Sequence, residues 1–177
     1  MFGRRKLPGK LRPALEKAER VIAWARVADE PNQVVVVTTL GLWLPGRARL
    51  GWHQIHKATW SGSRLSVIPS TPVDVADATG AAPAYTVMAD DTPVTFALAD
   101  PGDVPIEVRK RVTGSVVHTA HYPFASGGVR VVGRRVAGVD GLQWHVRYDP
   151  GTDTTDASVV TATAELVAEA IESRKPS

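Results

Sequence analysis

The 177-residue sequence contains no cysteine. This absence excludes a disulfide framework, a thiolate zinc site, an iron–sulfur cluster and a cysteine nucleophile. A chain of this length can bury a core without such cross-links, as one domain or one domain with a small appendage. We therefore expect the fold to depend on the packing of the 44% of residues that are apolar.

Long hydrophobic runs are also missing. The basic start, Met1 to Lys6, is followed by Pro8, Gly9 and charged residues, where a signal peptide would need an apolar stretch. A membrane-spanning helix needs about 20 apolar residues in succession. The valine run at 34–37 is far shorter and is typical of a buried strand. We expect a cytoplasmic protein, with peripheral attachment to the inner membrane face as an alternative.

The net charge is only +3, but the charges are segregated along the chain. Residues 1–64 carry +8 and residues 109–147 carry +6, whereas residues 65–108 carry −7 and residues 148–177 carry −4. Either oppositely charged elements lie side by side in one domain, or the chain presents a basic face to an acidic partner. The small net charge favours the first interpretation.

Short apolar segments separated by turn residues fill the region 20–98, with turns every 6–12 residues. This spacing predicts about seven strands in a small antiparallel sandwich or barrel, with Trp43, Trp52 and Ile55 in its interior or under the helix that follows. The predicted strands are 21–28, 33–39, 42–44, 48–60 (a bent strand or a strand pair), 65–70, 85–88 and 94–98, with a short helix over 13–20 and a loop over 71–83.

The pattern changes after residue 100. A stripe of valines spaced four residues apart predicts a helix that ends at Pro123 and packs on the sheet: Val104, Val108, Val112 and Val116. Alternation then predicts strands over 129–136 and 142–148, and a last amphipathic helix over 152–173.

Seven strands followed by one amphipathic helix is the pleckstrin-homology (PH) topology. The segments Val36–Trp43, Leu50–Ile55 and Trp60–Val67 resemble successive strands and turns of bacterial PH-like domains. The resemblance covers about residues 14–120, and the whole chain is similar to a family of proteins from high-GC bacteria.

The resemblance implies an α+β fold with a PH-like antiparallel β-barrel or sandwich and a capping helix over 104–118. A β-hairpin and a C-terminal helix extend it. The implied organisation is a flexible basic arm over 1–12, a PH-like domain over 13–122, and a strand–strand–helix extension over 124–177 packed on that domain.

No constellation of side chains points to catalysis. His53 and His56 lie three apart on a predicted strand and would face opposite sides, whereas His118 and His121 could share a helix face but lack a third metal ligand. The sequence has no Gly-x-Ser-x-Gly elbow, and the glycines at 127–128 precede no helix that could cradle a phosphate. We therefore expect neither an enzyme nor a bound metal or cofactor.

The resemblance implies a role in binding. PH-like domains offer sheet edges and a groove beside the helix, both suited to peptide capture, so we expect a non-catalytic binding or scaffolding module whose partner is another protein. Eukaryotic PH domains grip phosphoinositides with basic residues in the first loops between strands. Here the first such loop, Asp29-Glu30-Pro31-Asn32, is acidic, which argues against headgroup binding.

An alternative is electrostatic binding of nucleic acid or an anionic membrane surface. The segment 1–12 carries five basic residues and no acid, and the predicted hairpin would align basic side chains opposite Val129 and Val131. The candidate contact residues are Arg4, Arg5, Lys6, Arg130, Arg134, His145 and Arg147.

Overall fold

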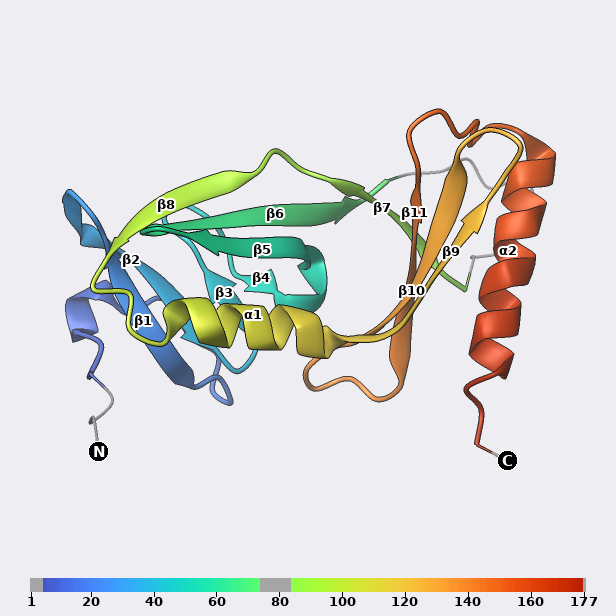
Figure 1. The fold of residues 1–177 in the computed structure, drawn as a ribbon. Helices are drawn as coiled ribbons and strands as arrows, with labels where there is room; N and C mark the ends of the chain where they lie inside the picture. Colours follow the sequence, from blue (N-terminus) through green and yellow to red (C-terminus); the bar gives the residue numbers. More distant parts are fainter. Residues whose placement is uncertain (1–4, 74–83, 177) are drawn as a thin grey trace. The chain divides into compact units, whose positions relative to one another are not determined.

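The computed structural model of the protein describes residues 5–73 and 84–176. The candidate residue Arg4 and most of the predicted loop over 71–83 lie outside the described residues. The chain divides into two compact units (Figure 1). The first comprises residues 1–70, 90–115 and 136–138, and the second comprises residues 71–89, 116–135 and 139–177.

The first unit contains, among its described residues, seven strands followed by helix α1, Val104–Ser115. Hydrogen bonding orders the strands β4-β3-β2-β1-β8-β6, and β5 pairs with β6. The bounds are β1 Val21–Val27, β2 Glu30–Thr38, β3 Gly41–Trp43, β4 Leu50–Gly51, β5 Ile55–Ser61, β6 Arg64–Pro72 and β8 Val94–Ala99, with 3-10 helices η1 at Gly9–Leu11 and η2 at Trp52–Gln54.

The core of the first unit lies between these strands and α1. Trp52 and Ile55 are buried, as predicted, whereas Trp43 is only half-buried. Three of the four valines in the run of β2 are fully buried, and α1 contributes the predicted valine face. The buried valines are Val35, Val36 and Val37 on β2, and Val104, Val108 and Val112 on α1. Packing of its valine face stabilises α1, because the sequence of α1 on its own favours a helix only weakly.

The predicted end of α1 is wrong. The helix ends at Ser115, and the next residues form strand β9, Val116–Pro123, which pairs antiparallel with β10, Gly128–Arg135. Gly114 and the β-branched residues around it disfavour a helix, whereas β-branched side chains suit a paired strand. Val116, the last valine of the predicted stripe, therefore begins a strand.

The second unit contains β9, β10, β7 (Thr86–Asp90), β11 (Leu142–Tyr148) and helix α2 (Ala157–Glu172). The strand order is β7-β11-β10-β9, and β7 runs parallel to β11. The N-cap of α2 is Asp156, whose side chain accepts a hydrogen bond from the Ser158 backbone N–H at 2.8 Å.

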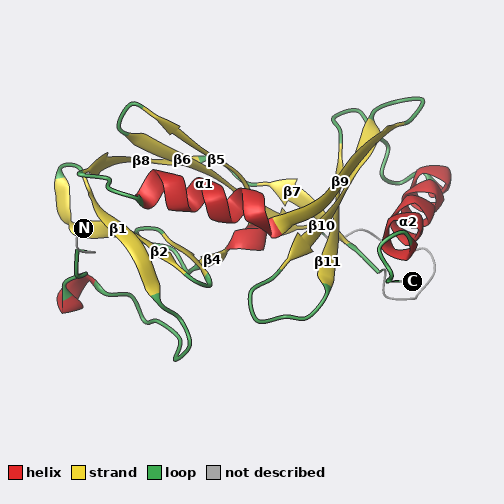
Figure 2. Ribbon diagram, turned by 60° about the horizontal axis from the view of Figure 1, so that its bottom comes forward, coloured by secondary structure: helices red, strands yellow, loops and turns green. Residues whose placement is uncertain are grey.

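Helix α2 packs against β10 (Figure 2). The buried residues between them are Val129 and Val131 of β10, Val146 of β11, and Val167 and Ala170 of α2. The valines at 129 and 131 thus face the core, as predicted. Among the described residues, no helix is long and apolar enough to cross a membrane.

The sheet is open, so the barrel, one of the two predicted forms beside a sandwich, is wrong. The fold is α+β, but among the described residues β4 pairs only with β3, and β5 pairs only with β6. Strand β4 has only two residues before the chain turns into η2, so it offers little edge for closure. Strand β7, predicted within the same meander, pairs in parallel with β11 of the second unit.

The described part of the predicted basic arm is not free. Leu7 is buried, Gly9–Leu11 form η1, and the Trp24 indole N–H donates a hydrogen bond to the Arg5 carbonyl at 2.9 Å. The predicted helix over 13–20 is also absent, and this segment is irregular with one turn at 17–18. Its residue Glu19 is buried, which fixes the segment against β2 and β3.

Candidate functional site

A groove of about 500 Å³ opens between β5 and the first turns of α1, which lie side by side. Its floor contains Leu65 and Val108, which belong to the hydrophobic core. The lining residues are Lys57, Ala58, Thr59, Trp60 and Leu65 from the strands, and Pro105, Ile106, Val108 and Arg109 from α1.

The strand side of the groove is the edge of β5. Successive side chains of a strand point to opposite faces, so a groove that contacts only one face would meet alternate residues. This groove instead meets four consecutive residues, 57–60. Within the described part of the chain β6 is the only strand that pairs with β5, so the opposite edge of β5 has no pairing strand there.

Exposed apolar side chains line both walls. Trp60 on β5 is 36% exposed, and Ile106 on α1 is 67% exposed. The described residues contain two further exposed large apolar side chains, Val73 and Val139, and neither lines the groove. Single exposed apolar residues are common on proteins, but two that line one groove form a surface suited to an apolar ligand side chain.

The charged residues of the groove are both cations. Lys57 and Arg109 are exposed, and neither forms an ion pair with a described residue. The acid nearest in sequence, Glu107, does not line the groove and lies 3.5 Å from Arg111 on its own helix. The groove is therefore apolar with an uncompensated positive charge.

The four candidate residues of the hairpin share one sheet face but do not form an exposed strip. Arg130 pairs in register with Arg147, and Val132 pairs with His145 on the same face. Arg130 is exposed, whereas Arg134 and His145 are buried. Burial, with the nearby charge of Arg147, lowers the pKa of Arg134 to about 10. Alternation predicted the face correctly but could not show that part of it is covered.

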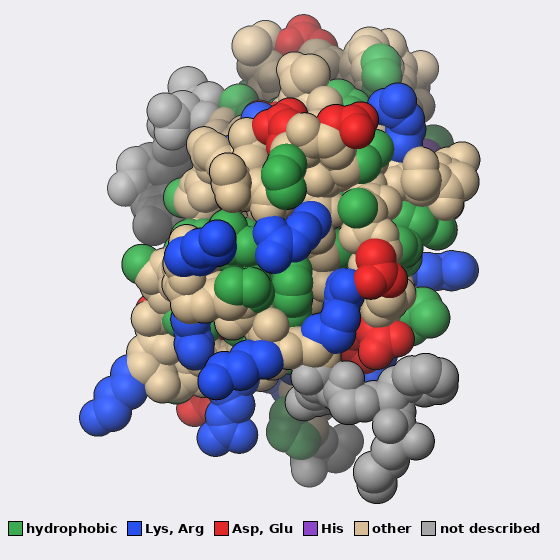
Figure 3. Space-filling view, turned by 90° about the vertical axis from the view of Figure 1, so that its left-hand side faces the viewer, with side chains coloured by type: hydrophobic (Ala, Val, Ile, Leu, Met, Phe, Trp, Pro, Cys, Tyr) green, Lys and Arg blue, Asp and Glu red, His purple; other side chains and the backbone are tan. Residues whose placement is uncertain are grey.

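The basic residues of the N-terminal segment gather on the first unit. Figure 3 looks onto the end of this unit that carries η1, β1 and β2, and shows many Lys and Arg side chains. Arg5 forms an ion pair with Asp100, whereas Lys6 remains exposed. Four further exposed cations in this segment are Lys10, Arg12, Lys17 and Arg20.

Sequence reasoning missed the role of Trp24. The Arg5 and Arg26 guanidinium carbons lie 5.0 Å and 5.7 Å from the centre of its ring, within the range of cation–π contacts. The signal for Arg26 was in the sequence, because residues two apart on a strand share a face. The contact from Arg5 comes from outside the strand and has no local signal.

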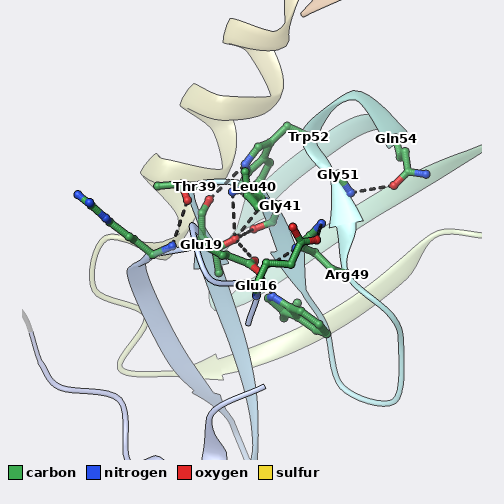
Figure 4. Close-up of polar contacts among 12 residues, drawn as sticks. Glu16, Glu19, Thr39, Leu40, Gly41, Arg49, Gly51, Trp52 and Gln54 are labelled. Carbon is green, nitrogen blue, oxygen red and sulfur yellow. Dashed lines mark hydrogen bonds and ion pairs between the residues drawn. The ribbon is translucent and has the colours of Figure 1, made fainter. Parts of the chain in front are cut away.

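A buried carboxylate network fixes the start of β1 beside the turn between β2 and β3 (Figure 4). Glu19 accepts hydrogen bonds from Thr38, from the Trp43 indole at 2.9 Å and from Arg49 at 2.7 Å. Burial alone would raise the pKa of Glu19, but these hydrogen bonds and one from the Glu16 backbone outweigh it and lower the pKa. With its oxygens satisfied in this way, Glu19 acts as a structural group.

The histidines do not form a metal site. His118 and His121 lie on β9, so residues three apart face opposite sides, rather than sharing a helix face as predicted. His121 contacts Asp149 at 2.6 Å, and the His118 ring lies 5.3 Å from that of Trp144. In the described ranges, no group of three His, Asp or Glu residues is placed to hold a metal ion.

We compared the chain with known protein families, curated proteins and solved structures. No protein-family model, no curated protein and no solved structure matches the chain.

Proposed function

We propose that the protein is a non-catalytic binding module that captures an extended segment of a partner protein between β5 and α1. The observation that carries the proposal is a groove of about 500 Å³ in which a strand edge without a pairing neighbour among the described residues meets an exposed helix face. A segment added to β5 would form main-chain hydrogen bonds, and one of its apolar side chains would bury Trp60 and Ile106.

The first unit also supports a PH-like architecture within this proposal. Its seven described strands precede one described α-helix whose valine face packs on the core, and the groove lies beside that helix. An open sheet is compatible with this use, because an added strand needs an unpaired edge.

The test is a selection of random peptides, each roughly ten residues long so that it can span a strand, on the full chain. Enriched peptides should lose about fivefold or more in affinity with Trp60→Ala or Ile106→Ala, since truncating an anchor of an interface costs more than about 1 kcal/mol. Val139→Ala is the matched control, because Val139 is an exposed apolar residue of the second unit.

Main-chain pairing needs its own readout. Alternate backbone N–H groups of a bound segment would donate to β5, and the others would point away from it. Methylating one alternate set of nitrogens in an enriched peptide removes the N–H donors of that set and leaves the side chains unchanged. We expect one of the two methylation patterns to abolish binding and the other to be tolerated. Peptides that bind the Trp60→Ala and Ile106→Ala proteins as tightly as the wild type would refute the proposal.

A second candidate function is electrostatic binding of nucleic acid or an anionic membrane surface through the first unit. Lys6, Lys10 and Arg12 are exposed and form no ion pair with described residues, which favours it. Binding to single-stranded DNA or to anionic vesicles should then fall steeply as salt rises. Reversing the charges of these three residues should remove that binding, whereas Arg130→Glu should not.

A further inference from the structure

The groove places its positive charge beside its apolar walls. Residues three apart on a helix are surface neighbours, so Arg109 lies next to Ile106 on the exposed face of α1, about 4.5 Å further along the axis. On the strand side, Lys57 also lines the groove, but it lies three residues from Trp60 on β5, so the two side chains point to opposite faces of the strand. The helix wall therefore joins an apolar side chain to a cation on one face, whereas β5 contributes Trp60 on one face and Lys57 on the other.

No acid among the described residues lines this groove, and the neighbouring charges do not compensate the two cations. Lys110 and Arg64, which are adjacent in sequence to lining residues, are also exposed and basic. An occupant with cationic side chains would be repelled, and a purely apolar occupant would leave the charges of Lys57 and Arg109 partly desolvated and unpaired.

From this arrangement we infer that the segment captured in the groove is an acidic strand of a partner protein, with an apolar side chain and a carboxylate at alternate positions. The inference rests on the proposed function and specifies its ligand. Side chains two apart in an extended chain point to the same side and lie about 6.5–7 Å apart. This spacing places an apolar side chain at Ile106 and Trp60 while the carboxylate reaches Arg109.

Strand alternation gives the sequence pattern of the ligand. The pattern is apolar-x-acidic or its reverse, according to the direction in which the segment runs along β5. A carboxylate one or three positions from the apolar residue would point to the face of β5 that carries Lys57. The carboxylates are expected to speed association and select the partner, whereas the apolar anchor supplies most of the affinity.

The first readout is the composition of the peptides enriched on the full chain. We expect Asp or Glu to be enriched two positions from an apolar residue. Replacing these acids by Asn or Gln in a synthetic, fluorescently labelled peptide should weaken binding about fivefold or more at low salt. The difference between the acidic and amide peptides should shrink as salt is added.

The second readout exchanges the charges of the protein. Arg109→Glu and Lys57→Glu should each lower the affinity for the acidic peptide. Each should raise the affinity for the same peptide with Lys in place of its acidic residues. Lys110→Glu is the matched control, because Lys110 is exposed on α1 but does not line the groove. Thermal melting of each variant shows whether it remains folded.

The outcomes separate the two proposals. If the enriched peptides depend on Trp60 and Ile106 but are neutral or basic, or ignore Arg109→Glu and Lys57→Glu, the acidic ligand is refuted and the peptide groove stands. If no enriched peptide depends on Trp60 or Ile106, both are refuted. Acidic peptides that depend on all four residues, and not on Lys110, support both.

Discussion

Replacing Glu19 by Gln tests what holds the start of β1 in place. The Glu19 side chain is fully buried, and it bonds Arg49 as well as the Thr38 hydroxyl and the Trp43 indole. Glutamine has nearly the same shape and keeps one carbonyl acceptor. The change removes the negative charge and replaces the second acceptor oxygen by an NH2 group, which cannot accept a hydrogen bond. Because a hydrogen bond to a charged group contributes about 1.5–3 kcal/mol, we expect Glu19→Gln to lower the free energy of unfolding by about 2–3 kcal/mol at neutral pH.

The pH dependence gives this prediction a signature. The folded-state pKa of Glu19 lies below its ordinary value of 4.5, so its stabilising contribution is complete above that value and is lost as the pH falls through the lowered pKa. Protonated Glu19 then resembles glutamine. The stability difference between the wild type and Glu19→Gln should therefore shrink in acid.

The assay is a urea titration followed by tryptophan fluorescence at neutral pH and at about pH 3. A Trp144→Phe background removes the one tryptophan of the second unit, so the signal reports the first unit. Glu16→Gln is the control, because Glu16 also bonds Arg49 at 2.7 Å but is exposed, and we expect it to cost less than about 1 kcal/mol. A difference below about 0.5 kcal/mol for Glu19→Gln at neutral pH, or one that does not shrink in acid, would refute the reasoning.

Three further predictions concern packing. Trp52→Ala should cost about 3–5 kcal/mol in a denaturant titration, because the residue is buried in the core of the first unit, and a cost below about 1 kcal/mol would show that it is not a core residue. Gly133→Ala should destabilise the second unit by about 1–3 kcal/mol in a thermal or chemical melt followed by circular dichroism, since the new Cβ would lie 3.2 Å from the Trp144 ring; an unchanged midpoint would contradict this. Deleting residues 1–12 should lower the melting temperature measurably, because Leu7 is buried and the Arg5 backbone accepts from Trp24, whereas a dispensable arm would leave it unchanged.

The sequence predicted correctly those elements in which the spacing of apolar residues corresponds to the spacing of buried positions. The valine run of β2 and the valine face at 104, 108 and 112 were read correctly, because both patterns reflect burial directly. The same four-residue spacing misled at Val116, because spacing cannot show that β10 offers a pairing partner. Tertiary pairing decided the structure of a segment with weak local preference.

In the candidate site, too, local pattern predicted some features, whereas others depend on tertiary structure. Alternation placed Arg130 and Arg134 on one face, but only the three-dimensional structure shows that Arg134 is buried. The resemblance to PH-like domains implied a groove beside the helix, but the sequence did not identify Trp60, Ile106 or Arg109 as its residues. Their association depends on which strand is left at the edge, and strand order is not encoded in the pattern of any single segment.

The exposed residues of the groove are not explained by the needs of folding. Helix α1 is held by its buried valines, and Ile106 on its outer face is 67% exposed, so it adds little to that packing. A β-branched residue at an exposed helical position is also a poorer helix former than alanine or lysine. Folding alone would therefore tolerate a polar side chain at Ile106, and the same holds to a lesser degree for Trp60. A ligand that buries both side chains gives a physical reason for their presence. An unpaired edge of β5 does not explain why these two positions are apolar.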